Sequence, residues 1–399
     1  MSGWITERLA VRVAAASLGL FLGPADHGLA QPATPPGPHS PELKIESALQ
    51  NYDLQFFGDV FVPAGVLNLT KKPHESFTLL RHLRPLIQSG GANIVNFEGA
   101  ATTAQFSKEE KSHLLRTSMR VPAALSQAGI VGITLANNHS MDYGLQGLFD
   151  TIALSEKAKL RTTGAGASEA DALRPMIIST DRTTYCIFAI SRTFPMSFWA
   201  TPHRPGTGTV SIKDAPALVS SCDGPHDFVV ASVHWGRELS RDVQPYQRAL
   251  AHAMIDGGAI AVVGHHPHIL QEVEVYKGKP IFYSLGNFIF GSRPKVGGQE
   301  GMAVGIRRTS DRNFEFRITP INVDNRVVHF VPRLFGPGEE DPVAAFLVNT
   351  KGCQVAAAPK QYFCRFVDEV VNAPKKPLPA ESHMTPATSE YVPQAADES

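Results

Sequence analysis

Residues 259–268 read AIAVVGHHPH, an apolar run followed by three histidines. The run 259–263 is rich in β-branched residues and carries no charge, which is typical of a buried strand. His265, His266 and His268 follow directly, at the end of the strand where open α/β sheets place their ligands. A single histidine there would usually be an ordinary packed or surface residue. Because neutral imidazole is the commonest metal ligand, this cluster predicts a metal site if other strands end in matching ligands.

The composition is that of a globular protein with one large domain or two ordinary ones. The chain has 399 residues, of which 43% are hydrophobic, enough for a sizeable core. Its 37 Lys and Arg balance 37 Asp and Glu, and no basic block stands out, so we expect no nucleic-acid partner. An anionic substrate would have to be held by local charges or by metal ions.

The N-terminus has the pattern of a secretory signal. Arg8 and Arg12 precede the apolar run 13–23, and the small residues Gly28 and Ala30 favour cleavage after Ala30. The run is short for an ordinary membrane span, and an uncleaved N-terminal anchor is the alternative. We therefore expect an exported protein, periplasmic or extracellular, that contacts the membrane only if this segment stays attached.

Composition also sets the expected domain boundaries. After the signal at residues 1–30, residues 31–41 are Pro-rich and predict an extended linker. Residues 372–399 consist mostly of Pro, Ala, Ser and charged residues and predict a disordered tail. The expected folded domain is residues 42–371.

The four cysteines show no zinc-type spacing such as CxxC. In an exported chain, Cys353–Cys364 and Cys186–Cys222 are the expected disulfides. Four cysteines allow three connectivities, and buried free thiols are the alternative.

Short apolar strands alternate with helical patterns through the folded domain. Strands are predicted at residues 54–57, 93–97, 130–136, 176–178, 185–190, 228–233, 259–263, 281–283, 314–318 and 327–331, and helices at 76–88, 122–128, 145–157 and 247–255. This alternation predicts an α/β layered domain rather than an all-β one.

Five of the predicted strands end in polar or ionisable residues. Together these are Asp59, Glu98, Asn138, His139, His234, His266 and His268. Such a mixed set of carboxylate, amide and imidazole groups suits Mn, Fe or Zn. Because one ion needs fewer ligands, the set predicts two ions about 3.5–4 Å apart that share a carboxylate and activate a water molecule. Taken singly, each residue has an ordinary explanation, such as a turn or a helix cap, and only their joint occurrence supports the prediction.

Four motifs in a fixed order resemble a known family. They are residues 137–144 (NNHSMDYG), 234–238 (HWGRE), 264–268 (GHHPH) and 283–288 (YSLGNF). Over about residues 54–291 the chain resembles the CapA family of bacterial capsule synthesis, whose relatives include the PgsA-type proteins of poly-γ-glutamate production. That family is similar to the calcineurin-like metallophosphoesterases. The resemblance implies a four-layer α/β/β/α sandwich with a two-metal centre between sheet edges.

The resemblance also implies a role for each strand-end residue. The implied metal ligands are Asp59, the bridging carboxylate Glu98, Asn138, His234, His266 and His268, and the implied protonating histidine is His139. The His-x-His spacing selects His266 and His268 and leaves His265 as a supporting neighbour. Asp142 either orients the imidazole of His139 or is an ordinary loop residue.

Two departures from the superfamily pattern concern the first metal position. Asp59-Val60-Phe61 lacks the histidine of the usual Asp-x-His, and the shared carboxylate is Glu98 rather than an Asp. The resemblance therefore implies a first metal position that is weaker or completed by another ligand.

The leading hypothesis is an exported hydrolase with two divalent ions (Mn, Fe or Zn) that acts on a phosphoester or a cell-envelope polymer, in contact with polymer synthesis and export machinery. Water would attack the phosphoester while protonated His139 donates to the leaving oxygen. One alternative is a non-catalytic assembly or binding subunit of a polymer export complex. Another is a metal-dependent hydrolase of the amide bonds in γ-linked glutamate, and the last is an exported globular protein without a metal.

Overall fold

A computed structural model describes residues 43–45, 52–67, 76–105, 111, 113–180, 183–222, 227–291, 298–310, 313–336, 338–347, 353–356 and 361–366. The predicted signal (1–30), linker (31–41) and tail (372–399) lie outside these residues.

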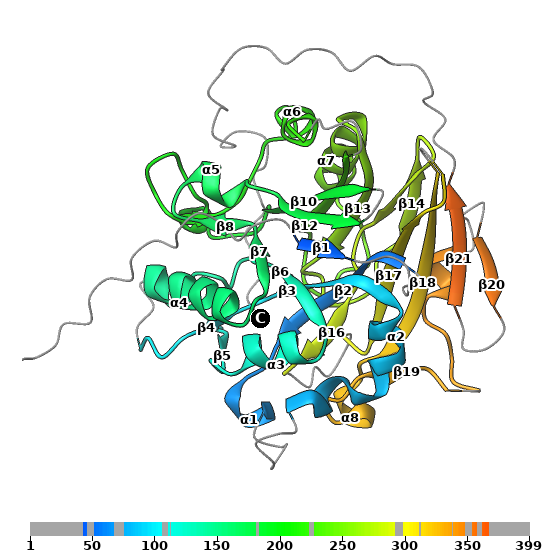
Figure 1. Cartoon of the computed structure of the whole chain (residues 1–399), viewed down its shortest axis with the longest axis horizontal. Coiled ribbons are helices and arrows are strands. Elements are labelled where there is room, and N and C mark those ends of the chain that lie inside the picture. Colours follow the sequence, from blue (N-terminus) through cyan, green and yellow to red (C-terminus); the bar gives the residue numbers. More distant parts are fainter. Residues whose placement is uncertain are drawn as a thin grey trace, which may run out of the picture. The chain divides into compact units, whose positions relative to one another are not determined.

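Most of the described strands belong to two large sheets (Figure 1). The seven-stranded sheet contains, in spatial order, β1 (Leu43–Ile45), β9 (Met176–Thr180), β10 (Thr184–Ser191), β12 (Asp227–His234), β13 (Ala259–His265), β15 (Lys279–Phe282) and β14 (Val273–Tyr276). The ten-stranded sheet contains β20 (Cys353–Ala356), β21 (Gln361–Phe366), β18 (Phe314–Asn322), β17 (Glu300–Arg308), β2 (Tyr52–Phe61), β3 (Gly90–Phe97), β6 (Ile130–Thr134) and β7 (Arg161–Thr163), with β16 (Asn287–Phe290) beside β2 and β19 (Arg333–Leu334) beside β18. Two short ladders pair β4 (Ala100–Ala101) with β5 (Arg116–Thr117), and β8 (Ala165–Gly166) with β11 (Gly206–Thr207).

The helices are mostly short. They are α1 (Ala64–Leu67), α2 (Arg84–Gln88), α3 (Val121–Gln127), α4 (Gly144–Lys157), α5 (Glu169–Ala172), α6 (Ala215–Ser220), α7 (Pro245–Asp256), α8 (Asn325–Val328) and α9 (Ala344–Leu347), with 3₁₀ turns η2 (Ser76–Leu83) and η3 (Met196–Phe198). No helix in the described residues has both the length and the apolar character needed to cross a membrane.

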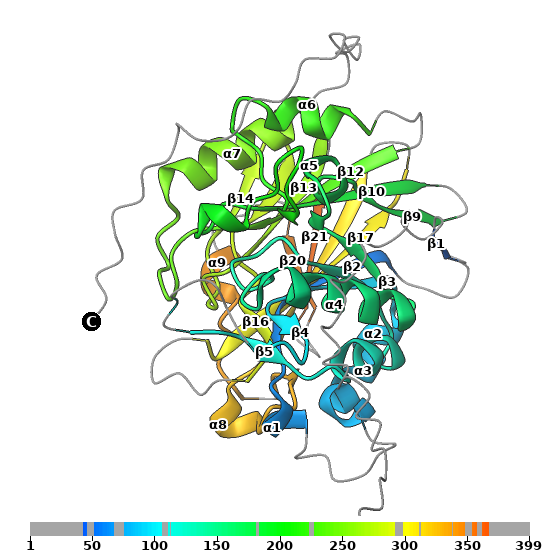
Figure 2. The ribbon, with the colours of Figure 1, turned by 90° about the vertical axis from the view of Figure 1, so that its left-hand side faces the viewer.

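Three apolar cores separate four layers. The central core joins the inner faces of the two sheets, for example Phe56 of β2 with Ile187 of β10. A second core packs α6 and α7 on the outer face of the seven-stranded sheet. In the third core, helices α2, α3 and α4 cover the ten-stranded sheet (Figure 2). The predicted four-layer α/β/β/α sandwich is therefore confirmed.

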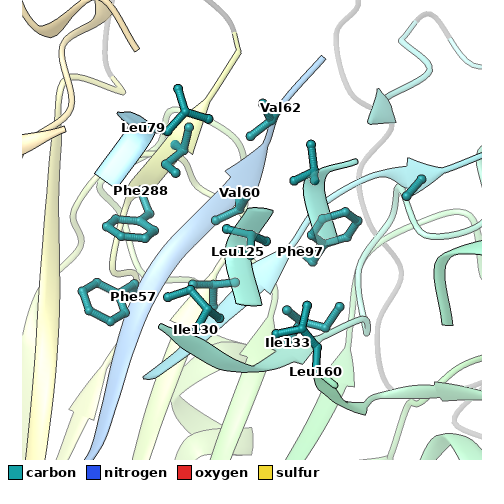
Figure 3. Close-up of a cluster of buried hydrophobic side chains, with 14 of the residues drawn as sticks. Phe57, Val60, Val62, Leu79, Phe97, Leu125, Ile130, Ile133, Leu160 and Phe288 are labelled. Atoms are coloured by element: carbon teal, nitrogen blue, oxygen red, sulfur yellow. The ribbon is translucent and has the colours of Figure 1, made fainter. Parts of the chain in front are cut away.

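The third core buries apolar residues of strands β2, β6 and β16. Phe57 of β2 stacks on Phe288 of β16 with ring centroids 4.5 Å apart. Figure 3 shows both rings beside Val60, with Leu125 of α3 and Ile130 of β6 in the same cluster. Burial of such side chains stabilises the fold by about 1.5–3 kcal/mol each. This core therefore fixes β2, which carries Asp59, against the helices beneath it.

Two predicted elements differ from the structure. The helix predicted over 76–88 is a 3₁₀ turn as far as Leu83, and α2 restarts at Arg84 with Pro85 at its beginning. Because proline has no backbone N–H, it cannot continue an α-helical ladder from the preceding turn. The strand predicted over 327–331 is wrong, since Asp324 accepts a hydrogen bond from the backbone N–H of Arg326 and starts α8 there.

Cysteines of the described residues form disulfides. A disulfide joins Cys186 of β10 to Cys222, as predicted. Cys364 is also disulfide-bonded, and it lies opposite Cys353 in the register of β20 and β21.

Candidate metal centre

The candidate site is built where five parallel strands end. β2, β3 and β6 come from the ten-stranded sheet, and β12 and β13 come from the seven-stranded sheet. These strands bring together the six predicted metal ligands, which lie hundreds of residues apart at the extremes. Their convergence between the two sheets follows from the parallel register.

Close backbone packing fixes Asp59. A bulge interrupts the pairing of β2 with β3 between Phe57 and Asp59. Asp59 donates its backbone N–H to the carbonyl of Gly286 at 3.0 Å. A Cβ on Gly58 would lie only 2.0 Å from that carbonyl oxygen, so no larger residue fits before Asp59.

The turn after β13, which carries His266 and His268, is also held by a contact with Asp59. His266 and His268 adopt positive φ angles of 98° and 58°, which are uncommon for residues other than glycine. The backbone N–H of His266 donates to Oδ2 of Asp59 at 3.2 Å. The turn is therefore tied to the strand that carries Asp59.

Two ligand groups result, and they share one carboxylate. Group one consists of Asp59, Glu98 and His268, and group two consists of Glu98, His234 and His266; the ligand atoms within each group lie within 4.8 Å of one another. Asn138 belongs beside group two, because its Oδ1 lies 2.8 Å from Nε2 of His234. Glu98 belongs to both groups, so it is the residue that could bridge two ions.

Glu98 supplies the test of whether these residues fit metal ions. Its side chain is completely buried, and within the described residues neither carboxylate oxygen has a hydrogen-bond partner. A buried charged group without partners is costly. Nε2 of His234 and Nε2 of His268 face Oε1 of Glu98 at 3.7 and 3.6 Å, too far for hydrogen bonds. Bare oxygens surrounded by imidazoles fit a pair of divalent cations.

The two groups differ in their electrostatics. Burial alone would raise the pKa of Asp59, but His265 and His268 hold it well below its usual value. Burial raises the pKa of Glu98 well above its usual value. Burial would lower the pKa of His268, yet Glu98 and Asp59 raise it to about 10. In group two, burial lowers the pKa of His266 to about 4 and also lowers the pKa of His234.

His139 and Asp142 form a hydrogen-bonded dyad at the edge of the centre. Nδ1 of His139 lies 2.7 Å from Oδ2 of the fully buried Asp142. Nε2 of the same ring lies 3.9 Å from Oε1 of Glu98. Burial lowers the pKa of His139, and Asp142 opposes this shift. Of the two alternatives for Asp142, the geometry favours orientation of the His139 imidazole.

His265, predicted as a supporting neighbour of the ligands, lies beside group one. Its Nδ1 is 3.3 Å from Oδ1 of Asp59. The imidazole therefore supports the carboxylate rather than facing Glu98.

Three further residues escaped the sequence analysis. Asn96 donates its side-chain amide to Oδ1 of Asp59 at 2.8 Å and lies 3.2 Å from Nδ1 of His234. Oδ1 of Asn287 lies 3.0 Å from Nδ1 of His268. Lys111 donates to Asp142 at 2.6 Å. A signal existed for Asn96, which is a polar residue inside an apolar strand, and for Asn287, which belongs to the YSLGNF motif; Lys111 had none.

The position expected to be weak is lined by aromatic rings. Phe61, which takes the place of a histidine, lies 5.4 Å from the ring of Phe290. The ring of Phe290 in turn lies 4.5 Å from that of His268. Among the described residues, Asn287 is the polar side chain that approaches His268 from β16.

Fold and site together define an α/β/β/α sandwich with residues suited to a pair of cations between its two sheets. The family model described as "Bacterial capsule synthesis protein PGA_cap" matches residues 53–292, and the chain belongs to this family.

Two curated relatives are named for the biosynthesis of PGA or of a capsule. The chain is 30% identical over 270 residues to the "PGA biosynthesis protein CapA" of Bacillus subtilis (strain 168), covering 67% of this chain and 70% of that protein. It is 32% identical over 240 residues to the "Capsule biosynthesis protein CapA" of Bacillus anthracis, covering 58% of each. Among solved structures, the NAD nucleotidase NadN of Haemophilus influenzae matches 63% of this chain and 47% of its own, with 13% identity and a TM-score of 0.41.

Proposed function

We propose that this protein is a hydrolase with two divalent metal ions that cleaves a phosphoester during the assembly of a capsule or poly-γ-glutamate polymer. The observation that carries the proposal is the pair of ligand groups that share Glu98. The names of the relatives supply the polymer context.

The residues of group one and group two would hold the two ions, and Asn138 would complete group two. Ions at these positions supply Lewis acidity, which neutralises the charge of a phosphoryl group and lowers the pKa of water. Mn, Fe and Zn are each suited to this mixture of oxygen and nitrogen ligands.

The chain's own proton-transfer group is His139. Asp142 accepts the Nδ1 proton of its ring, which leaves Nε2 directed toward the centre, 3.9 Å from Glu98. In the doubly protonated ring, Nε2 would give a proton to the leaving oxygen as the phosphorus–oxygen bond breaks. The phosphoryl group gains the oxygen of the attacking water, whose proton passes to solvent, and Nε2 takes up a proton from solvent before the next turnover. General acid–base groups of this kind contribute about 10²–10⁴-fold to a rate.

We further propose that the protein works outside the cytoplasm. The Cys186–Cys222 disulfide supports this location, because disulfides persist in oxidising compartments and are rare in the cytosol. The signal pattern in residues 1–30 points the same way.

Metal analysis and an aryl phosphodiester assay with Mn²⁺ test the hydrolase proposal. We expect about two ions per chain and hydrolysis that is lost in His266→Ala and strongly reduced in His139→Ala. His203→Ala is the matched control, since His203 is exposed and lies outside both groups. A folded wild-type protein without metal, or activity unchanged by His266→Ala, would contradict the proposal.

Incubation with γ-linked polyglutamate distinguishes the phosphoesterase from the two alternatives, an amide hydrolase and a non-catalytic assembly subunit. Cleavage of the polymer without cleavage of phosphoesters would replace the phosphoesterase by an amide hydrolase. Metal binding without either activity, together with co-purification of polymer machinery, would favour an assembly subunit.

A further inference from the structure

Lys111 holds the segment that carries His139 from the side. Its Nζ donates to Oδ1 of Asp142 and to the backbone carbonyl of Asn138, both at 2.6 Å, and lies 3.2 Å from Nδ1 of His139. Its side chain is 18% exposed, whereas that of Asp142 is completely buried. This ion pair therefore differs from the exposed pairs that contribute little to stability.

The carboxylate of Asp142 has its two oxygens occupied by different partners. Oδ1 faces Lys111, while Oδ2 accepts from the backbone N–H of Leu115 at 2.6 Å and contacts Nδ1 of His139 at 2.7 Å. Contacts on both oxygens fix the plane of the carboxylate. The plane of the carboxylate in turn fixes the direction of the His139 ring.

The second contact of Lys111 acts on Asn138. The ammonium group binds the main-chain carbonyl of Asn138, whose side-chain oxygen lies 2.8 Å from Nε2 of His234. One cation thus restrains both the residue that presents an amide to group two and the carboxylate that orients the acid–base histidine.

Lys111 also contacts the opposite half of the sandwich. Its Nζ lies 5.4 Å from the centre of the Phe198 ring, within the range of a cation–π interaction. Phe198 is buried in η3, which follows β10 of the seven-stranded sheet, whereas Asp142 follows β6 of the ten-stranded sheet. The lysine is therefore held in place from both sides of the site.

We propose that Lys111 is a positioning residue, which sets the direction of the His139 ring through Asp142 and through its own contact with Nδ1, and which acts through the Asn138 carbonyl on the shape of group two. For its effect on catalysis this inference rests on the hydrolase function proposed above. Its structural part, the orientation of His139, does not.

The structural part is tested by NMR on metal-free protein with ¹⁵N-labelled histidine. In wild type we expect a downfield Nδ1 proton for His139, assigned by its absence in His139→Asn, because Asp142 accepts it. The signal should disappear in Lys111→Met and persist in Lys213→Met, a matched change at an exposed lysine. An unchanged signal in folded Lys111→Met would overturn the proposal.

A measurement on wild type covers the case in which Lys111→Met does not fold. The Nζ protons of Lys111, observed with ¹⁵N-labelled lysine, should exchange slowly with water because two oxygens hold them. Exchange as fast as that of Lys213 would overturn the proposal.

The catalytic part is tested by kinetics and by rescue. Lys111→Met should lower kcat by about a hundredfold, the usual cost of a misplaced catalytic group, and leave KM within about twofold. Lys111→Cys should be equally impaired and should recover on aminoethylation with 2-bromoethylamine, which rebuilds a lysine analogue. An inactive wild type that still shows the histidine signal would refute the hydrolase and leave the positioning role standing; full activity in Lys111→Met would refute positioning in catalysis.

Discussion

Group one and group two meet at Glu98 but are chemically unlike. Group one combines two carboxylates with one imidazole, and group two combines one carboxylate with two imidazoles and the amide of Asn138. The pKa of His268 in group one is raised to about 10, while that of His266 in group two is lowered to about 4. The imidazoles of group two are therefore neutral at neutral pH and able to bind a cation, whereas His268 of group one must first lose a proton.

The aromatic lining increases this asymmetry. Phe290 packs on His268 of group one, and Phe61, at the position where the resemblance implies a histidine, packs on Phe290. We infer that a binuclear centre of this kind fills in two unequal steps, with group two first.

The largest effect is expected from Glu98→Gln, because this residue belongs to both groups. Losing the shared charge should remove both ions and abolish hydrolysis. Metal content after dialysis and phosphodiester turnover check this outcome. Glu315→Gln is the control, since Glu315 is a buried carboxylate outside the site, paired with Arg307. Retention of both ions in Glu98→Gln would mean that Glu98 does not bridge the two positions.

Single ligand changes should separate the two positions. His268→Ala removes a ligand of group one alone, and His266→Ala removes one of group two alone. Each variant should fall from about two ions per chain to about one. With Mn²⁺, the magnetic coupling between paired ions should vanish from the EPR spectrum of both variants. Loss of both ions in His268→Ala would show that the two positions fill together instead of in sequence.

The pH dependence of metal binding should also distinguish the groups. A proton on His268, whose metal-free pKa is raised to about 10, must leave before a cation binds. The affinity of group one should therefore rise with pH up to that value, by about tenfold per pH unit for one proton. His234 and His266 have lowered pKa values and are already neutral at pH 7. Glu98, whose pKa burial also raises, should release its proton when the first ion binds. Calorimetry in buffers of different ionisation enthalpy should therefore show proton release with each ion, and His268→Ala should remove the release that belongs to group one.

The sequence was enough to predict which strand ends the structure brings together. A polar residue after a short apolar run, as at Glu98 or His234, is a local signal, and parallel strands bring such ends together. The assignment of Glu98 as the shared ligand needed the family resemblance, because nothing local separates a bridging carboxylate from a terminal one. The structure then placed Glu98 between the two ligand groups.

Long-range partners could not be predicted in the same way. Lys111 reaches Asp142 across 31 residues, and neither residue carries a pattern that names the other. Asn96 lies within an apolar strand and bonds Asp59 from the neighbouring strand, which only the register of β2 with β3 reveals. The strand predicted over residues 327–331 was also wrong, because Asp324 caps a short helix there despite the β-branched side chains that favour a strand.

The smallest expected effect is a gain at group one from Phe61→His. Residues 59 and 61 of β2 point to the same face of the strand, because side chains alternate along it. An imidazole at this position would restore the Asp-x-His pair and supply group one with a further nitrogen ligand. We expect the second ion to bind about tenfold more tightly, at the lower end of what a supporting ligand contributes, while the first ion binds as before.

Phe61→Leu is the control, because it removes the contact between the Phe61 and Phe290 rings without adding a ligand. Equal tightening of both ions, or tightening in Phe61→Leu, would show that the unequal affinities arise from something other than the missing histidine.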